Sequence, residues 1–220
     1  MRCIKNLLDG ALVVLLLSSA LCAAERSALV SVGNLIYAGD KTSVCFSDRF
    51  LTTVETDAGI PTVKRFAAVR LSRLAELATT PFCIMNGQEA FAFTAEERAN
   101  LHVWLDRGGF LLASAGCSND AFASSFRKEI LAVCGADSLR ELSSDHALFS
   151  TVFPTKDPAL SHGGIGRFEG VVRDGRLAVL FSKEGLNDTA HTQGCCCCGG
   201  NEVKLAEELM ANALVLALVE

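Results

Sequence analysis

Hydrophobic and polar positions alternate along the chain in two recurring patterns. Short, nearly continuous apolar runs, such as PFCIMNG at residues 81–87 and GGFLLASAG at residues 108–116, are typical of strands buried on both faces. Between them lie segments whose apolar residues recur at helical spacing. Strands are expected over residues 28–40, 66–71, 81–87, 108–116, 168–172 and 176–182, and helices over residues 47–59, 72–77, 94–107, 118–134 and 202–220.

The ends of these elements carry their own signals. Thr94 and Glu97 form a T-x-x-E capping box, in which each residue satisfies a backbone N–H at the start of a helix. Ser47 is a candidate cap for the first helix, and Gly59 and Gly135 follow the ends of two helices. Residues 168–182 read as a hairpin, because Asp-Gly at its centre is typical turn chemistry.

The order of elements predicts the fold class. Strands that alternate with helices favour a parallel sheet covered by helices on both faces. We therefore expect a single doubly wound, mostly parallel α/β domain, with a C-terminal hairpin that adds one antiparallel strand near an edge and a closing apolar helix. Helix and strand ends are expected to deviate by a few residues.

The first 24 residues have the plan of a secretory signal peptide. A short basic start, MRCIK, precedes an apolar run that ends in small residues, and cleavage after Ala24 would leave Glu25 first. A membrane anchor ranks second, because the run is shorter than the roughly 20 residues of a spanning helix. A lipoprotein modified at Cys22 ranks third. Residues 25–220 then form the mature domain, periplasmic or secreted, with no stable membrane span.

Composition narrows the functional classes. Half of the chain is hydrophobic, which argues against disorder, and the net charge of −5 with scattered Lys and Arg gives no basic face for nucleic acid. No sequence-local phosphate or metal motif is present, so no cofactor and no metal site are predicted, although His162 and His191 are the better candidates for metal ligands. The partner is expected to be a small molecule or a protein.

The stretch GCCCCGG at residues 194–200 is unusual. Outside the cytoplasm cysteines persist as disulfides, and we expect a cysteine of Cys195–Cys198 to come within disulfide reach of Cys117 or of another cluster cysteine. A zinc site using the C-x-x-C pair of Cys195 and Cys198 with His191 and Cys117 is the alternative, since four adjacent residues alone do not suit tetrahedral zinc.

Nine short pieces in a fixed order carry a family resemblance: YAGD, VRLS, PFCIMNG, FTAEE, GGFLLA, FRKEI, SSDHALF, FEG and DGRLAVLFS. Together they resemble the bacterial family called domain of unknown function 4159, over nearly the whole mature chain. The resemblance implies a flavodoxin-like sheet related to class I glutamine amidotransferases, and it implies no reaction. The chain departs from the family pattern at YAGDK, where an aromatic residue commonly follows the Asp, and in the CCCC run.

Ligands of open α/β sheets bind beyond the carboxyl ends of the strands. Four segments leave predicted strands there, and each combines glycine with a polar or reactive side chain: residues 38–40, 86–89, 114–117 and 182–185. A single segment of this kind is explained by helix capping and turns, but four together favour a binding site. The predicted ligand-binding residues are Asp40, Asn86, Gly87, Glu89 and Ser182.

Cys117 is the candidate nucleophile. It follows a buried strand and precedes a helix, the position of a nucleophile elbow, where a helix N-terminus favours a thiolate. Asp145 and His146 complete the candidate catalytic set if the fold brings them to Cys117, although SSDHALF reads equally well as a turn. The resemblance to amidotransferases implies a G-x-C-x-G elbow and a later His-x-Glu pair. The chain has SAGCSND and no His-x-Glu, so a glutaminase triad is not supported.

Two functions follow from these residues. A non-catalytic binding or assembly module of the cell envelope is preferred, because the triad is incomplete and no local cofactor motif is present. The alternative is a thiol-dependent hydrolase or amidotransferase relative that uses Cys117 with His146. Whether the protein is an enzyme therefore stays open at this point, and the sequence names no substrate.

Overall fold

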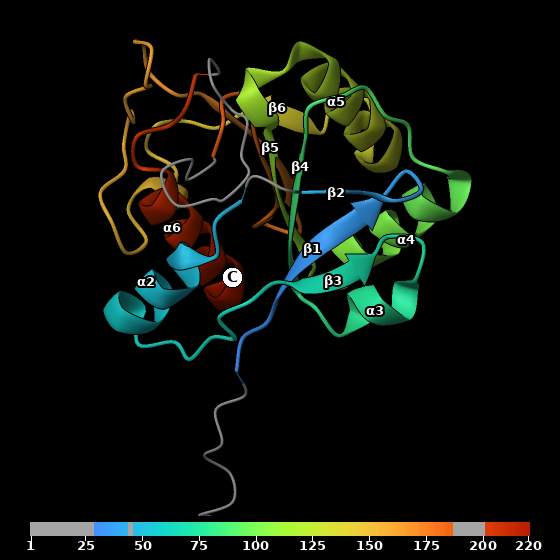
Figure 1. Cartoon of the computed structure of the whole chain (residues 1–220), viewed down its shortest axis with the longest axis horizontal. Coiled ribbons are helices and arrows are strands. Elements are labelled where there is room, and N and C mark those ends of the chain that lie inside the picture. The colour runs from blue at the N-terminus through green and yellow to red at the C-terminus, as the bar shows by residue number, and fades with distance from the viewer. Residues whose placement is uncertain (1–28, 44–45, 187–200) are drawn as a thin grey trace, which may run out of the picture.

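One mostly parallel sheet of eight strands organises the molecule, with helices on both of its faces (Figure 1). The computed structural model describes residues 29–43, 46–186 and 201–220. The strands are β1 (Val32–Tyr37), β2 (Lys41–Thr42), β3 (Ala67–Arg70), β4 (Phe82–Gly87), β5 (Phe110–Ala115), β6 (Leu139–Glu141), β7 (Phe168–Arg173) and β8 (Arg176–Ser182).

Five of the strands are parallel and lie side by side in the order β3-β1-β4-β5-β8. On the β8 side the sheet continues with β7, antiparallel to β8, and then with β6, antiparallel to β7. The two-residue strand β2 pairs antiparallel with the end of β1. The carboxyl ends of all five parallel strands therefore meet at one edge, which is called the carboxyl edge below.

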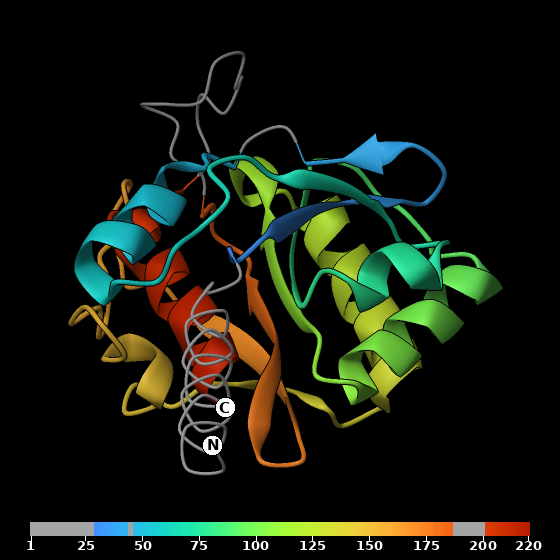
Figure 2. The same cartoon turned by 90° about the horizontal axis from the view of Figure 1, so that it is seen from below.

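Two layers of helices cover the sheet. The helices α2 (Arg49–Ala58) and α6 (Ala206–Val219) pack on one face, and α3 (Leu74–Ala78), α4 (Ala95–Asp106) and α5 (Asp120–Cys134) pack on the other (Figure 2). Each layer encloses its own hydrophobic cluster. Because β4 and β5 are buried on both sides, their side chains alternate between the two clusters, which explains why these strands appear in the sequence as unbroken apolar runs.

Most predicted elements are present, with shifted ends. The capping box of Thr94 and Glu97 is confirmed, since both of its hydrogen bonds are formed. The first long helix starts after Asp48 rather than Ser47, whose hydroxyl instead accepts a hydrogen bond from the Arg49 N–H. The closing helix begins at Ala206, four residues later than predicted, because Glu202 and Val203 form bridges with neighbouring segments.

The sequence did not predict the short strands. Neither β2 nor β6 has an apolar run, since β6 (LRE) is largely exposed at the outer edge. The antiparallel strand β7 is consequently not the edge strand, because it lies between β8 and β6. These strands form through backbone pairing with a neighbour, which short-range hydrophobic periodicity does not report.

Some expectations concern residues outside the described ranges. The predicted signal peptide at residues 1–24, the cysteine cluster Cys195–Cys198 and His191 all lie there. Within residues 29–43, 46–186 and 201–220, no helix has the length and apolar character that crossing a membrane requires.

A buried asparagine on α6 holds the long connection that precedes β7. Asn212 has no exposed surface, and its side-chain oxygen, Oδ1, accepts hydrogen bonds from the backbone N–H groups of Val152 (2.9 Å) and Phe153 (2.8 Å). Its amide donates to the Phe153 carbonyl (2.9 Å) and to the Thr155 hydroxyl (3.2 Å). All four bonds are made, so a polar side chain is accommodated inside an otherwise apolar helix face.

We expect Asn212→Ala to lower the free energy of unfolding by about 2–4 kcal/mol, because it leaves several buried polar groups without partners. Asn100→Ala is the matched control. Asn100 makes one such bond, to the Leu71 carbonyl, and its loss should cost about 0.5–1.5 kcal/mol. Urea denaturation measures both values, and equal losses would contradict a special role for Asn212.

Candidate functional site

Three neighbouring parallel strands carry a buried polar side chain at the same level, just before the carboxyl edge. Asn86 on β4 is paired in register with Ser114 on β5, and Ser114 is paired with Ser182 on β8. All three are fully buried. Residues in register on parallel strands point to the same face, here the face covered by α2 and α6. These three residues are called the polar row below.

Only some of the hydrogen-bonding groups of the polar row are bonded to one another. The Asn86 amide donates to the Ser114 carbonyl (3.1 Å) and hydroxyl (3.3 Å), and the Asn86 backbone N–H donates to the hydroxyl of Ser43 (2.7 Å). The Ser182 hydroxyl is buried and has no hydrogen-bond partner among the described residues. A hydroxyl in this state costs about 1–3 kcal/mol of stability, so Ser182 is poorly explained by folding alone.

A cavity of about 190 Å³ opens beside the polar row, where β1 and β4 end. Its mouth carries an ion pair between Lys41 and Glu89 (2.8 Å), and the hydrogen bond from Lys41 lowers the pKa of Glu89. The Tyr37 hydroxyl donates to the Asn86 carbonyl (3.0 Å), and burial raises the pKa of Tyr37, which keeps the phenol protonated as a donor. The cavity is lined by Tyr37, Lys41, Thr42, Asn86, Gly87, Gln88 and Glu89.

Cys117 lies next to this cavity in a strained turn. It follows β5 within the single 3₁₀ turn Gly116–Ser118, and both Cys117 (φ 52°) and Ser118 (φ 53°) have left-handed backbone conformations. Non-glycine residues rarely adopt this conformation, and such outliers are concentrated at functional sites. The Gln88 side-chain amide donates to the Cys117 sulfur at 3.4 Å. Gln88 therefore connects the thiol to the cavity.

The turn is held by the segment that leads into α6. The Ser118 hydroxyl donates to the Asn201 carbonyl (2.7 Å) and accepts from the Asn201 N–H (3.0 Å). The same Asn201 carbonyl accepts from the Gly185 N–H, and the Gly185 carbonyl accepts from the Val203 N–H, both at 3.0 Å. Two hydrogen bonds on one hydroxyl offset the strain of the left-handed turn.

A second connection crosses from the end of β8 to the start of α5. Lys183 forms an ion pair with Asp120 (2.8 Å), and this hydrogen bond lowers the pKa of Asp120. Both side chains are well exposed, so the pair contributes little to stability. The ion pair does hold the ammonium group of Lys183 beside Asp120, three residues after Cys117.

The structure brings some of the predicted ligand-binding residues together and separates others. Asn86, Gly87 and Glu89 line the cavity, and Ser182 lies in the polar row with Asn86. Asp40 does not line the cavity. Its side chain is 95% exposed in the turn between β1 and β2 and lies 3.5 Å from Arg70.

The candidate catalytic residues Asp145 and His146 have other partners. Asp145 forms an ion pair with Lys156 (2.5 Å), which lowers the pKa of Asp145. The Nδ1 atom of His146 accepts a hydrogen bond from the Leu148 N–H (3.1 Å) and so caps a 3₁₀ turn, Ala147–Phe149. Within the described part of the chain, neither side chain makes a hydrogen bond or ion pair with Cys117.

Cys117 itself is a free thiol. The structure therefore gives no support to the expected disulfide at Cys117, while the cluster that would supply the other sulfur lies outside the described residues. Burial raises the pKa of Cys134 to about 11 and raises that of Cys83 further. Of these three thiols, Cys83 is fully buried, whereas Cys117 and Cys134 are partly exposed.

The sequence analysis did not single out several residues of the cavity between β1 and β4 and of the polar row. Tyr37 was missed because nothing local shows that the ends of β1 and β4 are neighbours, and Gln88 was noted only as part of the segment of residues 86–89. Ser114 was noted only as part of a segment. A signal for the polar row was nevertheless available, since each of three apolar runs turns polar at or near its last residue: Asn86, Ser114 and Ser182.

A comparison with known protein families covers all the residues of the candidate site. A family model described as domain of unknown function (DUF4159) matches residues 37–218. The chain belongs to the DUF4159 family. This confirms the family resemblance of the sequence, and the matched part of the DUF4159 domain contains the cavity, the polar row and Cys117. A search of curated proteins found no match.

We expect Ser182→Ala in the DUF4159 domain to leave stability unchanged or to raise the free energy of unfolding by about 1–2 kcal/mol, because it removes a buried hydroxyl that has no partner among the described residues. Ser114→Ala is the matched control on the adjacent strand. It removes the acceptor of an Asn86 hydrogen bond and should lower stability by about 0.5–1.5 kcal/mol. Thermal and urea denaturation compare the two, and a clear loss of stability in Ser182→Ala would show that its hydroxyl has a structural role.

Proposed function

We propose that this DUF4159 domain is a non-catalytic binding module that takes a small polar ligand at the carboxyl edge, in the cavity between the ends of β1 and β4. The observation that carries the proposal is the cavity itself, where the phenol of Tyr37 and the side-chain amides of Asn86 and Gln88 come together at the end of the polar row. Ser182, two strands away in the same row, adds a buried hydroxyl that has no partner among the described residues, and such groups are tolerated chiefly near a site that a ligand or a reaction uses. Asn86 belongs to both the row and the cavity lining.

The order of the strands supports this location. Numbered along the chain, the five parallel strands have the order 2-1-3-4-5, which is that of flavodoxin-like sheets. We infer from it a flavodoxin-like wound arrangement, consistent with kinship to amidotransferase-like domains. In such sheets the ligand crevice lies where the order reverses, between the first and third strands. Here these are β1 and β4, whose ends flank the cavity.

We further propose that the module acts outside the cytoplasm, as part of the cell envelope. The support is the basic, apolar and small-residue pattern of the first 24 residues. An exported protein has no access to most cytoplasmic cofactors, which agrees with a site built from hydroxyl, amide and phenol groups. Assembly of envelope components and capture of a small solute both fit this placement.

The test of the binding proposal is a soak of protein crystals in a library of small amides, alcohols and carboxylates. Polar fragments should occupy the cavity between Tyr37 and Gln88, because hydrogen-bonding groups converge there. Thr42→Trp, at an exposed position of the lining, should abolish this occupancy. Thr56→Trp, exposed on α2, is the control and should leave it intact. Fragments that collect elsewhere, or that still bind in Thr42→Trp, would count against the proposal.

A second candidate function is that of a thiol-dependent hydrolase or amidotransferase relative that uses Cys117. The left-handed backbone at Cys117, between β5 and α5, favours it, because nucleophile elbows hold their nucleophile in a strained strand–turn–helix. Its weakness is that, within the described residues, no base contacts Cys117. The one side chain bonded to the sulfur within the described residues is the amide of Gln88, which cannot accept the thiol proton as a base.

Alkylation distinguishes the two candidates. In the native protein iodoacetamide should modify Cys117 before Cys134 and Cys83, whose raised pKa values and burial suppress the thiolate. If the binding proposal holds, Cys117 should react no faster than glutathione at the same pH. Peptide mass mapping over time gives the rate at each site. A rate about tenfold or more above that of glutathione would favour the enzyme.

A further inference from the structure

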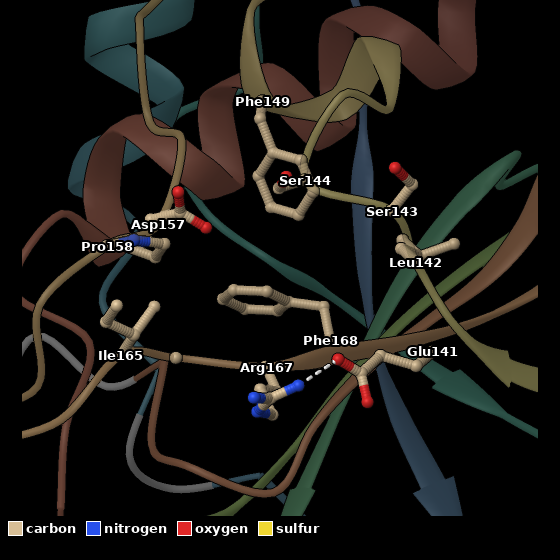
Figure 3. A pocket seen from close by; sticks show the side chains of 11 residues that line it. Glu141, Leu142, Ser143, Ser144, Phe149, Asp157, Pro158, Ile165, Arg167 and Phe168 are labelled. Atoms are coloured by element: carbon tan, nitrogen blue, oxygen red, sulfur yellow. Dashed lines mark hydrogen bonds and ion pairs between the residues drawn. The ribbon is translucent and has the colours of Figure 1, made fainter.

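A second cavity, of about 280 Å³, lies away from the candidate site, between the segment that follows β6 and the segment that leads into β7 (Figure 3). Its volume approaches the lower limit of small-molecule sites, about 300 Å³. It shares no lining residue with the cavity at β1 and β4.

Polar and apolar groups both line this cavity, and the apolar part consists of aromatic and aliphatic side chains. The rings of Phe149 and Phe168 meet at 5.6 Å between centroids, tilted by 56°, and Figure 3 shows them facing the space between the two segments. Pro158 and Ile165 form the opposite wall. Ile165 is 57% exposed and provides apolar surface for a ligand.

The charges of the lining leave one carboxylate unpaired. Arg167 forms an ion pair with Glu141 (2.5 Å), so these two groups neutralise each other. Asp157 makes no hydrogen bond or close ion pair with any residue that the structure describes. The adjacent cation, Lys156, forms its ion pair with Asp145, and the charge of Asp157 acts on Lys156 only at longer range, where it helps to raise the pKa of Lys156. In Figure 3 the Asp157 carboxylate lies beside Pro158 at the margin of the apolar surface. The lining therefore carries a net charge of −1.

The walls of the cavity are held in place before any ligand arrives. Asn212 binds residues 152–155 from beneath, as described above, and the Thr155 N–H donates to the Phe149 carbonyl (2.9 Å). Ala159 and Ile165 form an antiparallel β-bridge, which holds together the two ends of the segment that leads into β7. A site with fixed walls loses little conformational entropy on binding.

We propose that this cavity binds a primary amine with a short apolar body. The ammonium group pairs with Asp157, and the body lies on Phe149, Phe168 and Ile165. An anion is disfavoured because the only cation of the lining, Arg167, is already paired with Glu141. This proposal does not depend on the function proposed for the carboxyl edge.

The test uses three probes of one shape: 2-phenylethylamine, 2-phenylethanol and 3-phenylpropionate. Titration of the ¹⁵N-labelled protein should give saturable shifts at residues 141–149 and 157–168 with the amine, with at least about tenfold weaker binding of the alcohol and none of the acid. Asp157→Asn should weaken amine binding about tenfold or more, to the level of the alcohol. Ile165→Ala should weaken both probes by about threefold to fivefold, since apolar contact is lost.

Asp174→Asn is the matched control. Asp157 (φ 49°) and Asp174 (φ 50°) are both exposed aspartates in a left-handed conformation, which asparagine also tolerates, and Asp174 lies in the distant β7–β8 turn. This variant should bind the amine as the unmodified protein does. Equal binding of amine and alcohol, an unchanged affinity in Asp157→Asn, or shifts confined to the carboxyl edge would each overturn the proposal.

Discussion

The burial of the sheet on both faces is the constraint on which the rest of the structure depends. Because helices cover β4, β5 and β8 from both sides, these strands have almost no room for polar side chains along their length. Burial of each Leu or Phe side chain contributes about 1.5–3 kcal/mol to the stability of the folded state, so a polar replacement inside the strands lowers stability. Polar chemistry is thereby confined to the strand ends and to the connections, which is where both cavities lie.

The same constraint explains how much could be predicted from the sequence. Continuous apolar runs and helix-end signals located the central strands and the long helices, and the segments that combine glycine with polar residues after predicted strands identified Asn86 and Ser182. The partners across the sheet could not be predicted, since Tyr37 reaches Asn86 only after distant segments pair. Asp145 and His146 show the opposite case, because a short motif suggested chemistry where the structure has an ion pair and a turn.

The turn at Cys117 combines strain with anchoring. Two consecutive non-glycine residues in left-handed conformations cost of order 1–3 kcal/mol each. Ser118 compensates by binding both backbone groups of Asn201, a residue 83 positions along the chain. The orientation of the thiol thus depends on a contact that only the folded domain makes, whichever of the two candidate functions applies.

The hydrogen bonds around Gly185 have a consequence for how the chain tolerates change. Gly185 is bonded to the backbone of Asn201 and Val203, and the backbone of Asn201 is bonded in turn to Ser118. All but the contact of Ser118 use backbone groups, so the side chains at 185, 201 and 203 can change without loss of these bonds. Ser118 is the exception, because its hydroxyl is the bonding group, and this position should tolerate substitution least.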